Sequence, residues 1–303
     1  MSMTRMALPE ERRPQLKRLI ERRVLLRAME CHDPLSAVIA QSASAGASSR
    51  AVHFDVLWAS GFSRATSMAL PDAELFLHER RMDVLSDIAA VTTRPILADG
   101  DTGGDALAFV QLCRRLEQIG VSGVVIEDKR GSKRTSLSEQ VNHELEDASV
   151  FVEKLEYARA KLSSADFLIF ARTEALIAGA GIERALERVR TYLRSGADGI
   201  VIHSKDRSGR EIVEFLAGYR ALQAALGIEK PLICIPTAYN HMTAAELHAR
   251  GAQIVIYGNH MIRAAFRGMQ LAARSVLEHD RSLEADALCA PLPEIFDSIG
   301  VDA

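Results

Sequence analysis

The sequence predicts one closed (β/α)8 barrel, or TIM barrel, formed by a single domain over residues 1–303. Short apolar runs typical of strands recur along the chain, segments of helical periodicity separate them, and the strand-like runs number about eight. A chain of 303 residues, of which 48% are hydrophobic and 25% charged, is long enough to bury the core of one such barrel.

The strand-like runs are apolar throughout, whereas a strand with one solvated face alternates apolar and polar residues. This pattern is typical of parallel strands covered on both faces, and about eight of them favour closure into a barrel. In chain order, the predicted strands are Val24–Met29, Asp55–Ala59, Pro95–Ala98, Gly123–Ile126, Phe167–Ala171, Gly199–Ile202, Leu232–Ile235 and Gln253–Tyr257.

The intervening segments carry apolar residues three and four positions apart, as amphipathic helices do. Gly120, Gly196 and Gly251 indicate helix ends, because glycine readily adopts the left-handed backbone that closes a helix. A further helix is expected near the N-terminus, over about residues 9–23. The intervening helices are predicted at Ala106–Gln118, Ala148–Ala160, Ile182–Arg194 and Ala244–Arg250.

Two segments interrupt this alternation. The small residues at 42–49 are expected to form a surface connection, whereas the segment of about 129–143 is too long and polar for an ordinary turn. Because it begins at a strand end that carries Glu127 and Asp128, we expect it to be a gating loop. The tail ends in an apolar patch, Ile295–Ile299, for which docking on the barrel and docking on a neighbouring chain both stay open.

The composition argues against several classes of partner. The formal charge is −3, with both signs interspersed, so neither nucleic acid nor an anionic membrane is an expected partner. The four cysteines lack the spacing of metal or disulfide motifs, which favours reduced thiols in a cytosol. The N-terminus lacks a secretory apolar stretch, and no run is long enough to span a bilayer, so we expect a cytoplasmic protein with a small ligand.

Acidic residues follow two neighbouring predicted strands. Asp99 and Asp101 follow the third strand and Glu127 follows the fourth, and the carboxyl ends of barrel strands form the face where such enzymes build their sites. Three carboxylates with little sulfur or imidazole suit Mg²⁺ held partly through water. The run Asp-Gly-Asp-Thr-Gly at 99–103 is also typical of a simple turn, which stands as the alternative.

Other polar residues at predicted strand ends suit an anion. Arg172 is placed to hold a carboxylate or phosphoryl group by paired hydrogen bonds, and the alternative is a structural ion pair with Glu174. His203 is either a hydrogen-bond donor to such a group or a structural histidine. Ser60 and Gly61 form either an anion cradle or a turn.

Several motifs follow one another in a consistent order over roughly residues 24 to 300. They are Trp58-Ala59-Ser60-Gly61-Phe62, Pro71-Asp72-Ala73, Asp99-Gly100-Asp101-Thr102-Gly103, Glu127-Asp128-Lys129, Lys133-Arg134-Thr135-Ser136, Ala171-Arg172-Thr173-Glu174-Ala175, Ile202-His203-Ser204 and Gly258-Asn259-His260. Together they resemble the phosphoenolpyruvate mutase/isocitrate lyase superfamily. The resemblance implies a barrel whose eighth helix is exchanged with a neighbouring subunit in a homodimer or homotetramer. It also implies a site for Mg²⁺, with Mn²⁺ or Co²⁺ as substitutes, and for a phosphonate or 2-oxo acid substrate.

The resemblance also implies a role for each matching residue. It places Asp99 in direct contact with Mg²⁺. The residues implied to hold the waters of Mg²⁺ are Asp72, Asp101 and Glu127. Those implied to bind the substrate, mainly its pyruvoyl part, are Trp58, Ser60, Gly61 and Asn259. The implied catalytic residues, which hold the phosphoryl part or face it from the gating loop, are Lys133, Thr135, Ser136, Arg172 and His203.

The gating loop differs between the subfamilies. The carbon–carbon lyases carry a Lys-Lys-Cys-Gly-His type motif, the mutases Lys-x-Asn-Ser, and the hydrolases that act on phosphonopyruvate Lys-x-Thr-Ser. This chain has Lys133-Arg134-Thr135-Ser136, so the resemblance implies Mg²⁺-dependent hydrolysis of the P–C bond of phosphonopyruvate to pyruvate and phosphate. The alternatives are phosphoenolpyruvate mutase activity, a 2-oxo acid lyase or decarboxylase, and a non-catalytic binding barrel. Arg130-Gly131-Ser132 departs from the bulky residue and proline of many relatives.

Overall fold

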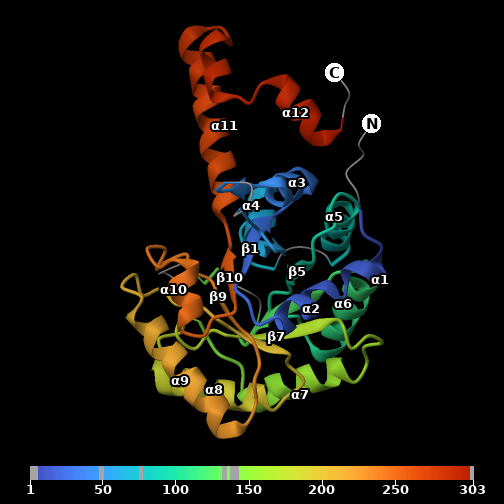
Figure 1. Cartoon of the computed structure of the whole chain (residues 1–303), viewed down its shortest axis with the longest axis vertical. Helices are drawn as coiled ribbons and strands as arrows, with labels where there is room; N and C mark the ends of the chain where they lie inside the picture. The colour runs from blue at the N-terminus through green and yellow to red at the C-terminus, as the bar shows by residue number, and fades with distance from the viewer. Residues whose placement is uncertain (1–5, 48–50, 75–77, 132–134, 137–142, 301–303) are drawn as a thin grey trace.

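Eight parallel strands close into a barrel in the order β1-β10-β9-β8-β7-β6-β5-β4, surrounded by helices (Figure 1). The computed structural model describes residues 6–47, 51–74, 78–131, 135–136 and 143–300. The closed barrel confirms the predicted fold and its eight predicted strands. The strands are β1 Leu26–Cys31, β4 Val56–Ala59, β5 Ile96–Asp99, β6 Gly123–Glu127, β7 Leu168–Thr173, β8 Gly199–Ile202, β9 Leu232–Cys234 and β10 Ile254–Tyr257.

The helices cover the outside of the barrel and agree with the amphipathic segments of the sequence. The four predicted inter-strand helices are confirmed within one residue at either end, as α6, α7, α8 and α10. The helices between the strands and after the last strand are α3 Pro34–Ser42, α4 Gly61–Ser67, α5 His78–Ala90, α6 Ala106–Gln118, α7 Ala148–Arg159, α8 Gly181–Leu193, α9 Arg210–Leu226, α10 Ala244–Ala249 and α11 His260–His279.

Each strand divides its apolar side chains between two cores. Leu97 and Val125 lie in the cluster inside the barrel, whereas their chain neighbours Ile96 and Val124 lie in the cluster between strands and helices. Successive side chains of a strand point to opposite faces, so a strand that is covered on both faces is apolar throughout. This packing explains the apolar runs of the sequence.

The N-terminal segment differs from its prediction. The sequence predicts one helix over about 9–23, but the structure contains two short helices, α1 Pro9–Arg12 and α2 Gln15–Glu21. Pro14 separates them, because proline lacks the N–H that a continuous helix needs and its ring clashes with the preceding turn. Leu16 of α2 is fully buried in the cluster inside the barrel, so α2 packs against its N-terminal end.

The surface connection and the C-terminal arm complete the chain. Residues 44–47 are exposed, as predicted, and Ser44–Ala45 (β2) pairs with Val52–His53 (β3). After the barrel, α11 extends away from it, and the chain returns through η2 Leu283–Leu288 and α12 Leu292–Ile299 (Figure 1). Helix α12, which contains the apolar patch of the tail, contacts α3 of its own chain. Among the described helices, none combines the length and the apolarity needed to cross a membrane.

Candidate active site

A cavity lies at the C-terminal ends of the strands, the face on which the sequence analysis places the site. The predicted site residues that line it are Trp58, Ser60, Asp72, Asp99, Thr135, Ser136, Arg172, His203 and Asn259, and they are joined by Phe62, Ile235, Thr237 and Gly258. Gly61, Asp101 and Glu127 belong to the same strand ends but are not part of the lining. Lys133 lies outside the described residues.

Arg172 is the centre of one side of this cavity. It is the penultimate residue of β7, in register with Glu127 of β6, and its Nε donates to Glu174 Oε1 at 2.5 Å. Its Nη2 donates to Ser136 Oγ at 2.9 Å and lies 3.2 Å from His203 Nδ1. Burial opposes the charge of Arg172, but the carboxylates of Glu174 and Glu127 outweigh burial and raise the pKa of Arg172. The ion pair between Arg172 and Glu174, which was the predicted alternative, is therefore present. The same Arg172 guanidinium also lines the cavity.

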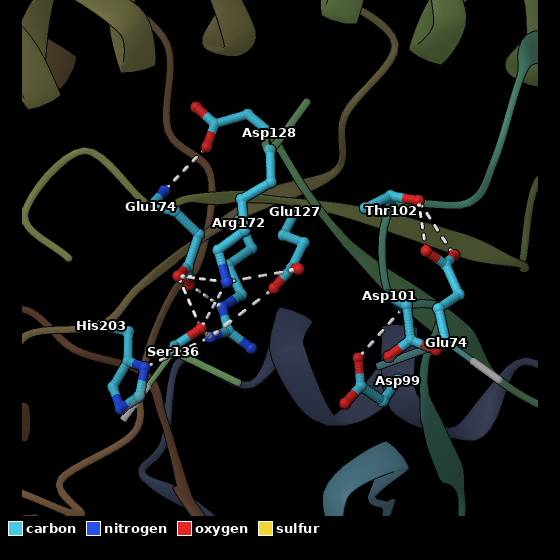
Figure 2. A network of polar contacts seen from close by, with 11 residues as sticks. Glu74, Asp99, Asp101, Thr102, Glu127, Asp128, Ser136, Arg172, Glu174 and His203 are labelled. Carbon is cyan, nitrogen blue, oxygen red and sulfur yellow. Dashed lines mark hydrogen bonds and ion pairs between the residues drawn. The ribbon is translucent and has the colours of Figure 1, made fainter. Parts of the chain in front are cut away.

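Glu174 and Lys129 are buried members of this group that the sequence analysis does not assign to the site. Glu174 Oε2 lies 3.1 Å from Lys129 Nζ and accepts a hydrogen bond from Ser136 Oγ at 2.7 Å. Lys129 Nζ also donates to Ser136 Oγ at 2.7 Å. Burial alone would raise the pKa of Glu174, but Arg172 and Lys129 lower it well below its ordinary value. The gating-loop residue Ser136 is thus held by three strand-end side chains (Figure 2).

Asp128 supports this group from the side of α8. Its Oδ1 accepts the backbone N–H of Glu174 at 2.8 Å, and its Oδ2 accepts from Arg188 Nε at 2.7 Å and from Tyr192 Oη at 2.6 Å. All three partners are buried. Asp128 therefore links the strand end that carries Glu174 to α8. The only sequence signal for this role is its place in the strand-end motif beside Glu127.

His203 presents a hydrogen-bond donor without a partner. Its Nδ1 faces Arg172 Nη2, which only donates, so Nδ1 is the acceptor and the hydrogen of the neutral ring is on Nε2. Within the described part of the chain, the buried Nε2 has no hydrogen-bond partner. Burial, followed by the charge of Arg172, lowers the pKa of His203 to about 3, so the ring is neutral at physiological pH. A buried unpaired donor is costly, and an anionic ligand oxygen in the cavity would satisfy it.

Asp99 marks the other side of the cavity. It ends β5, and its carboxylate oxygens accept the backbone N–H groups of Gly61 and Asp101, each at 3.2 Å. Gly100 lies between the two aspartates because a Cβ there would be 2.7 Å from Val124 Cγ2. Asp101 adopts a left-handed backbone with φ of 54°, which few residues other than glycine tolerate. The turn that was the alternative interpretation of residues 99–103 is therefore present. Asp99, its first residue, also lines the cavity.

Two further side chains that the sequence analysis misses surround this turn. Arg81 of α5 donates from Nη1 to the backbone oxygen of Asp99 at 2.9 Å and from Nη2 to Asp101 Oδ2. Thr102 Oγ1 donates to both carboxylate oxygens of Glu74, at 2.9 and 3.0 Å. Figure 2 shows Glu74, Asp99 and Asp101 grouped apart from the group around Arg172. Neither Arg81 nor Glu74 follows a strand directly, so strand-end reasoning does not find them.

The donors on the Asp99 side fit a hard divalent cation. Among the described residues, no three His, Cys, Asp or Glu side chains form a ready-made metal cluster. However, Asp72 and Asp99 line the same cavity, and Mg²⁺ usually binds proteins through one or two carboxylates while it keeps several waters. This donor set, all oxygen and without thiolate or imidazole, suits Mg²⁺ better than a softer metal.

Comparisons with known proteins agree with this geometry. A family described as phosphoenolpyruvate phosphomutase matches residues 16–277. The phosphoenolpyruvate phosphomutase of Tetrahymena pyriformis is 33% identical over 95% of this chain and 91% of its own length. The phosphonopyruvate hydrolase of Variovorax sp. is 34% identical over 91% of this chain and 90% of its own length.

Solved structures give the same pair of relatives. A phosphoenolpyruvate phosphomutase from Streptomyces platensis subsp. rosaceus superimposes with a TM-score of 0.87 at 33% identity, and 95% of each chain is covered. A phosphonopyruvate hydrolase in complex with oxalate and Mg²⁺ superimposes with a TM-score of 0.82 at 32% identity, again over 95% of each chain. The mutase and the hydrolase are thus about equally similar to this chain.

Proposed function

The chain belongs to the phosphoenolpyruvate phosphomutase family and so is an enzyme of the phosphoenolpyruvate mutase/isocitrate lyase superfamily, and within this superfamily we propose that it is a phosphonopyruvate hydrolase. The observation that carries the proposal is a set of groups that line the cavity and can donate hydrogen bonds to a phosphoryl group, namely Arg172, His203 Nε2 and the Thr135 hydroxyl. Ser136, whose hydroxyl already donates to Glu174, lines the cavity beside them. Water attacks phosphorus, the P–C bond breaks with its electron pair left on carbon, and protonation of the resulting enolate gives pyruvate.

The Arg172 side holds the phosphoryl group in this proposal. Arg172 keeps its charge because Glu174 is paired with it, and a guanidinium binds phosphoryl oxygens through directional hydrogen bonds. The His203 Nε2–H donates to another phosphoryl oxygen, and Lys133 adds a charge from the gating loop. Donors fixed before the reaction lower the free energy of the transition state without further reorganisation.

The Asp99 side holds the 2-oxo acid end. In this proposal Trp58, Ser60 and Gly61 contact the pyruvoyl part, and Asn259 also binds the substrate. Trp58, Ser60 and Asn259 line the cavity, and the Gly61 N–H donates to Asp99. Asp99 would hold Mg²⁺ directly; the residues that would hold its waters are Asp72, Asp101 and Glu127. When bound, Mg²⁺, with Mn²⁺ or Co²⁺ as substitutes, supplies positive charge that stabilises negative charge on the C2 oxygen.

Thr135 favours hydrolysis over phosphoryl return to the enolate. It lines the cavity beside Ser136, and a threonine offers one short hydroxyl where an asparagine would extend an amide. The shorter side chain leaves room for water and holds the phosphoryl group less firmly. The mutase is the second candidate, because the mutase from Tetrahymena pyriformis is as similar to this chain as the hydrolase is.

A phosphorus NMR time course of the purified protein with Mg²⁺ tests the proposal. With phosphonopyruvate as substrate, we expect inorganic phosphate to appear in the phosphorus spectrum, and a proton spectrum of the same sample to show an equal amount of pyruvate. A phosphoenolpyruvate resonance would identify a mutase instead, pyruvate formed from oxaloacetate without phosphate would identify a decarboxylase, and no turnover would indicate a binding protein. In the same assay, Thr135→Asn should shift product from phosphate toward phosphoenolpyruvate, with Thr93→Asn as the control outside the cavity.

The assembly is a second part of the proposal: a homodimer or homotetramer in which α11 is exchanged between subunits. Helix α11 extends from the barrel, and its Phe266, Met269 and Leu277 are 55%, 63% and 84% exposed, which is unusual for large apolar side chains in one helix. Light scattering after size exclusion should give a mass of two or four chains. Met269→Glu with Leu277→Glu should lower it, and a monomeric parent protein would contradict the exchange.

A further inference from the structure

Arg81 is a cation that the fold places among the carboxylates of the Asp99 side. It comes from α5, its side chain is 14% exposed, and it bridges two positions of one turn. Nη1 binds the backbone oxygen of Asp99 at 2.9 Å, and Nη2 binds the Asp101 carboxylate, which is 3% exposed. A cation bound by Asp99 and Asp101 would therefore share the Asp101 carboxylate with a fixed guanidinium.

We propose that Arg81 is a built-in counter-charge of this cation site, which pairs with the Asp101 carboxylate and weakens the binding of Mg²⁺. The inference deepens the proposed function, because it depends on Mg²⁺ binding at Asp99. Arg81 competes for the Asp101 carboxylate and repels a divalent ion, and both effects favour the metal-free protein. By linkage, an interaction that is stronger in the metal-free protein lowers the affinity for the metal.

The turn keeps its shape through contacts that do not involve Arg81. The backbone N–H of Glu127 donates to the backbone oxygen of Asp101 at 2.8 Å, and the backbone N–H of Asp101 donates to Asp99 Oδ1 at 3.2 Å. Thr102, the next residue, is bound to Glu74. Loss of Arg81 should therefore leave the turn in place and remove mainly a positive charge. The loss of this charge should raise the affinity of the site for Mg²⁺. Its carboxylate neighbours, led by Asp101, outweigh burial and raise the pKa of Arg81, so the charge is permanent.

Isothermal titration of the full-length protein with MgCl₂, after treatment with EDTA, tests the proposal directly. Arg81→Gln should lower the Kd for Mg²⁺ about tenfold, because a nearby like charge is removed in a poorly solvated site. Arg81→Lys keeps the charge and should stay within about threefold of the parent protein. Arg80→Gln is the matched control, since Arg80 is an exposed neighbour on the same helix with the same charge, and its Kd should not change.

Thermal unfolding supplies a readout that does not depend on turnover. In EDTA, Arg81→Gln should unfold at a lower temperature than the parent protein, because the ion pair with Asp101 is lost, and saturating Mg²⁺ should raise its Tm more than it raises that of the parent. Arg81→Met serves the same measurement if the glutamine variant does not fold.

The outcomes separate this inference from the proposed function. If the parent protein binds Mg²⁺ but the glutamine and methionine variants bind it no more tightly, the role of Arg81 is wrong while the Mg²⁺ site stands. Weaker binding by both the lysine and the glutamine variants would show that Arg81 aligns Asp101 for the metal, which also overturns the inference. If the parent protein shows neither heat nor a Mg²⁺-dependent Tm shift, both the inference and the metal part of the proposed function fail.

Discussion

The two sides of the cavity balance their charges in opposite ways. Among the described residues, the Arg172 side contains two cations, Lys129 and Arg172, and two carboxylates, Glu127 and Glu174, with mutual contacts. In the same part of the chain, the Asp99 side contains the carboxylates of Asp72, Glu74, Asp99 and Asp101 and the guanidinium of Arg81, which pairs with the Asp101 carboxylate. In Figure 2, Glu74, Asp99 and Asp101 lie apart from Glu127, Arg172 and Glu174.

This difference indicates what each side can bind. On the Arg172 side, Arg172 and Lys129 are charged and oriented by buried partners, and the His203 Nε2–H, which no described residue accepts, leaves capacity for anionic oxygen. On the Asp99 side the carboxylates offer oxygen ligands to a cation, and the burial of Asp99 and Asp101 strengthens their attraction for it. A substrate with a phosphoryl group at one end and a metal-binding 2-oxo acid at the other matches both sides at once.

Arg172→Lys should have the largest effect, because it removes hydrogen-bond donors from the anion-binding Arg172 side. A lysine keeps the charge beside Glu174 but loses the paired donors to Ser136 and His203, so we expect kcat/KM for phosphonopyruvate to fall about 10³-fold. The affinity for Mg²⁺ should stay within about twofold, because the Asp99 side is unchanged. Steady-state assays and metal titration measure the two effects, with the exposed Arg184→Lys as control. A loss smaller than tenfold would contradict the assignment.

Asp99→Asn should weaken Mg²⁺ binding on the Asp99 side, with a smaller effect than that of Arg172→Lys on catalysis. The amide keeps the shape of the carboxylate but loses its charge, so the Kd for Mg²⁺ should rise about 100-fold. Calorimetric titration measures this change, and Asp83→Asn, an exposed carboxylate on α5, is the control. An unchanged Kd would place the metal elsewhere and remove the distinction between the two sides.

The smallest expected effect concerns His203 on the Arg172 side and is a change in how stability depends on pH. The pKa of His203 is lowered to about 3 in the folded protein, so below pH 6.5 the unfolded chain binds a proton that the native ring does not. This contribution to stability is present above the unfolded pKa and is lost as pH falls toward 3.

The variant His203→Asn lacks that proton equilibrium. Between pH 7 and 5.5, its free energy of unfolding should fall by about 1 kcal/mol less than that of the parent protein. Urea unfolding at several pH values measures the difference, and His279→Asn, an exposed histidine of α11, should leave the pH slope of the parent unchanged. Equal slopes in the His203 variant and the parent would show that the native ring is readily protonated.

Much of the barrel and of its site follows from local pattern. Apolar runs such as Phe167–Ala171 are strands because both of their faces are buried, and the residue that follows such a run in a parallel barrel must lie at the carboxyl face. That logic finds Asp99, Arg172 and His203, each at or directly after a strand end. It overlooks the break at Pro14, where the local effect of proline outweighs the helical pattern.

The chain order of apolar and polar residues therefore determines the barrel, the face of the site and the residues at its strand ends. The tertiary structure alone decides which side chains meet there: Arg81 with Asp101, Ser136 with Arg172 and Glu174, and Asp128 with Tyr192. These partners are 20 to 64 positions apart along the chain. Local periodicity reports which face of an element is buried, whereas a contact between distant side chains depends on how the elements pack.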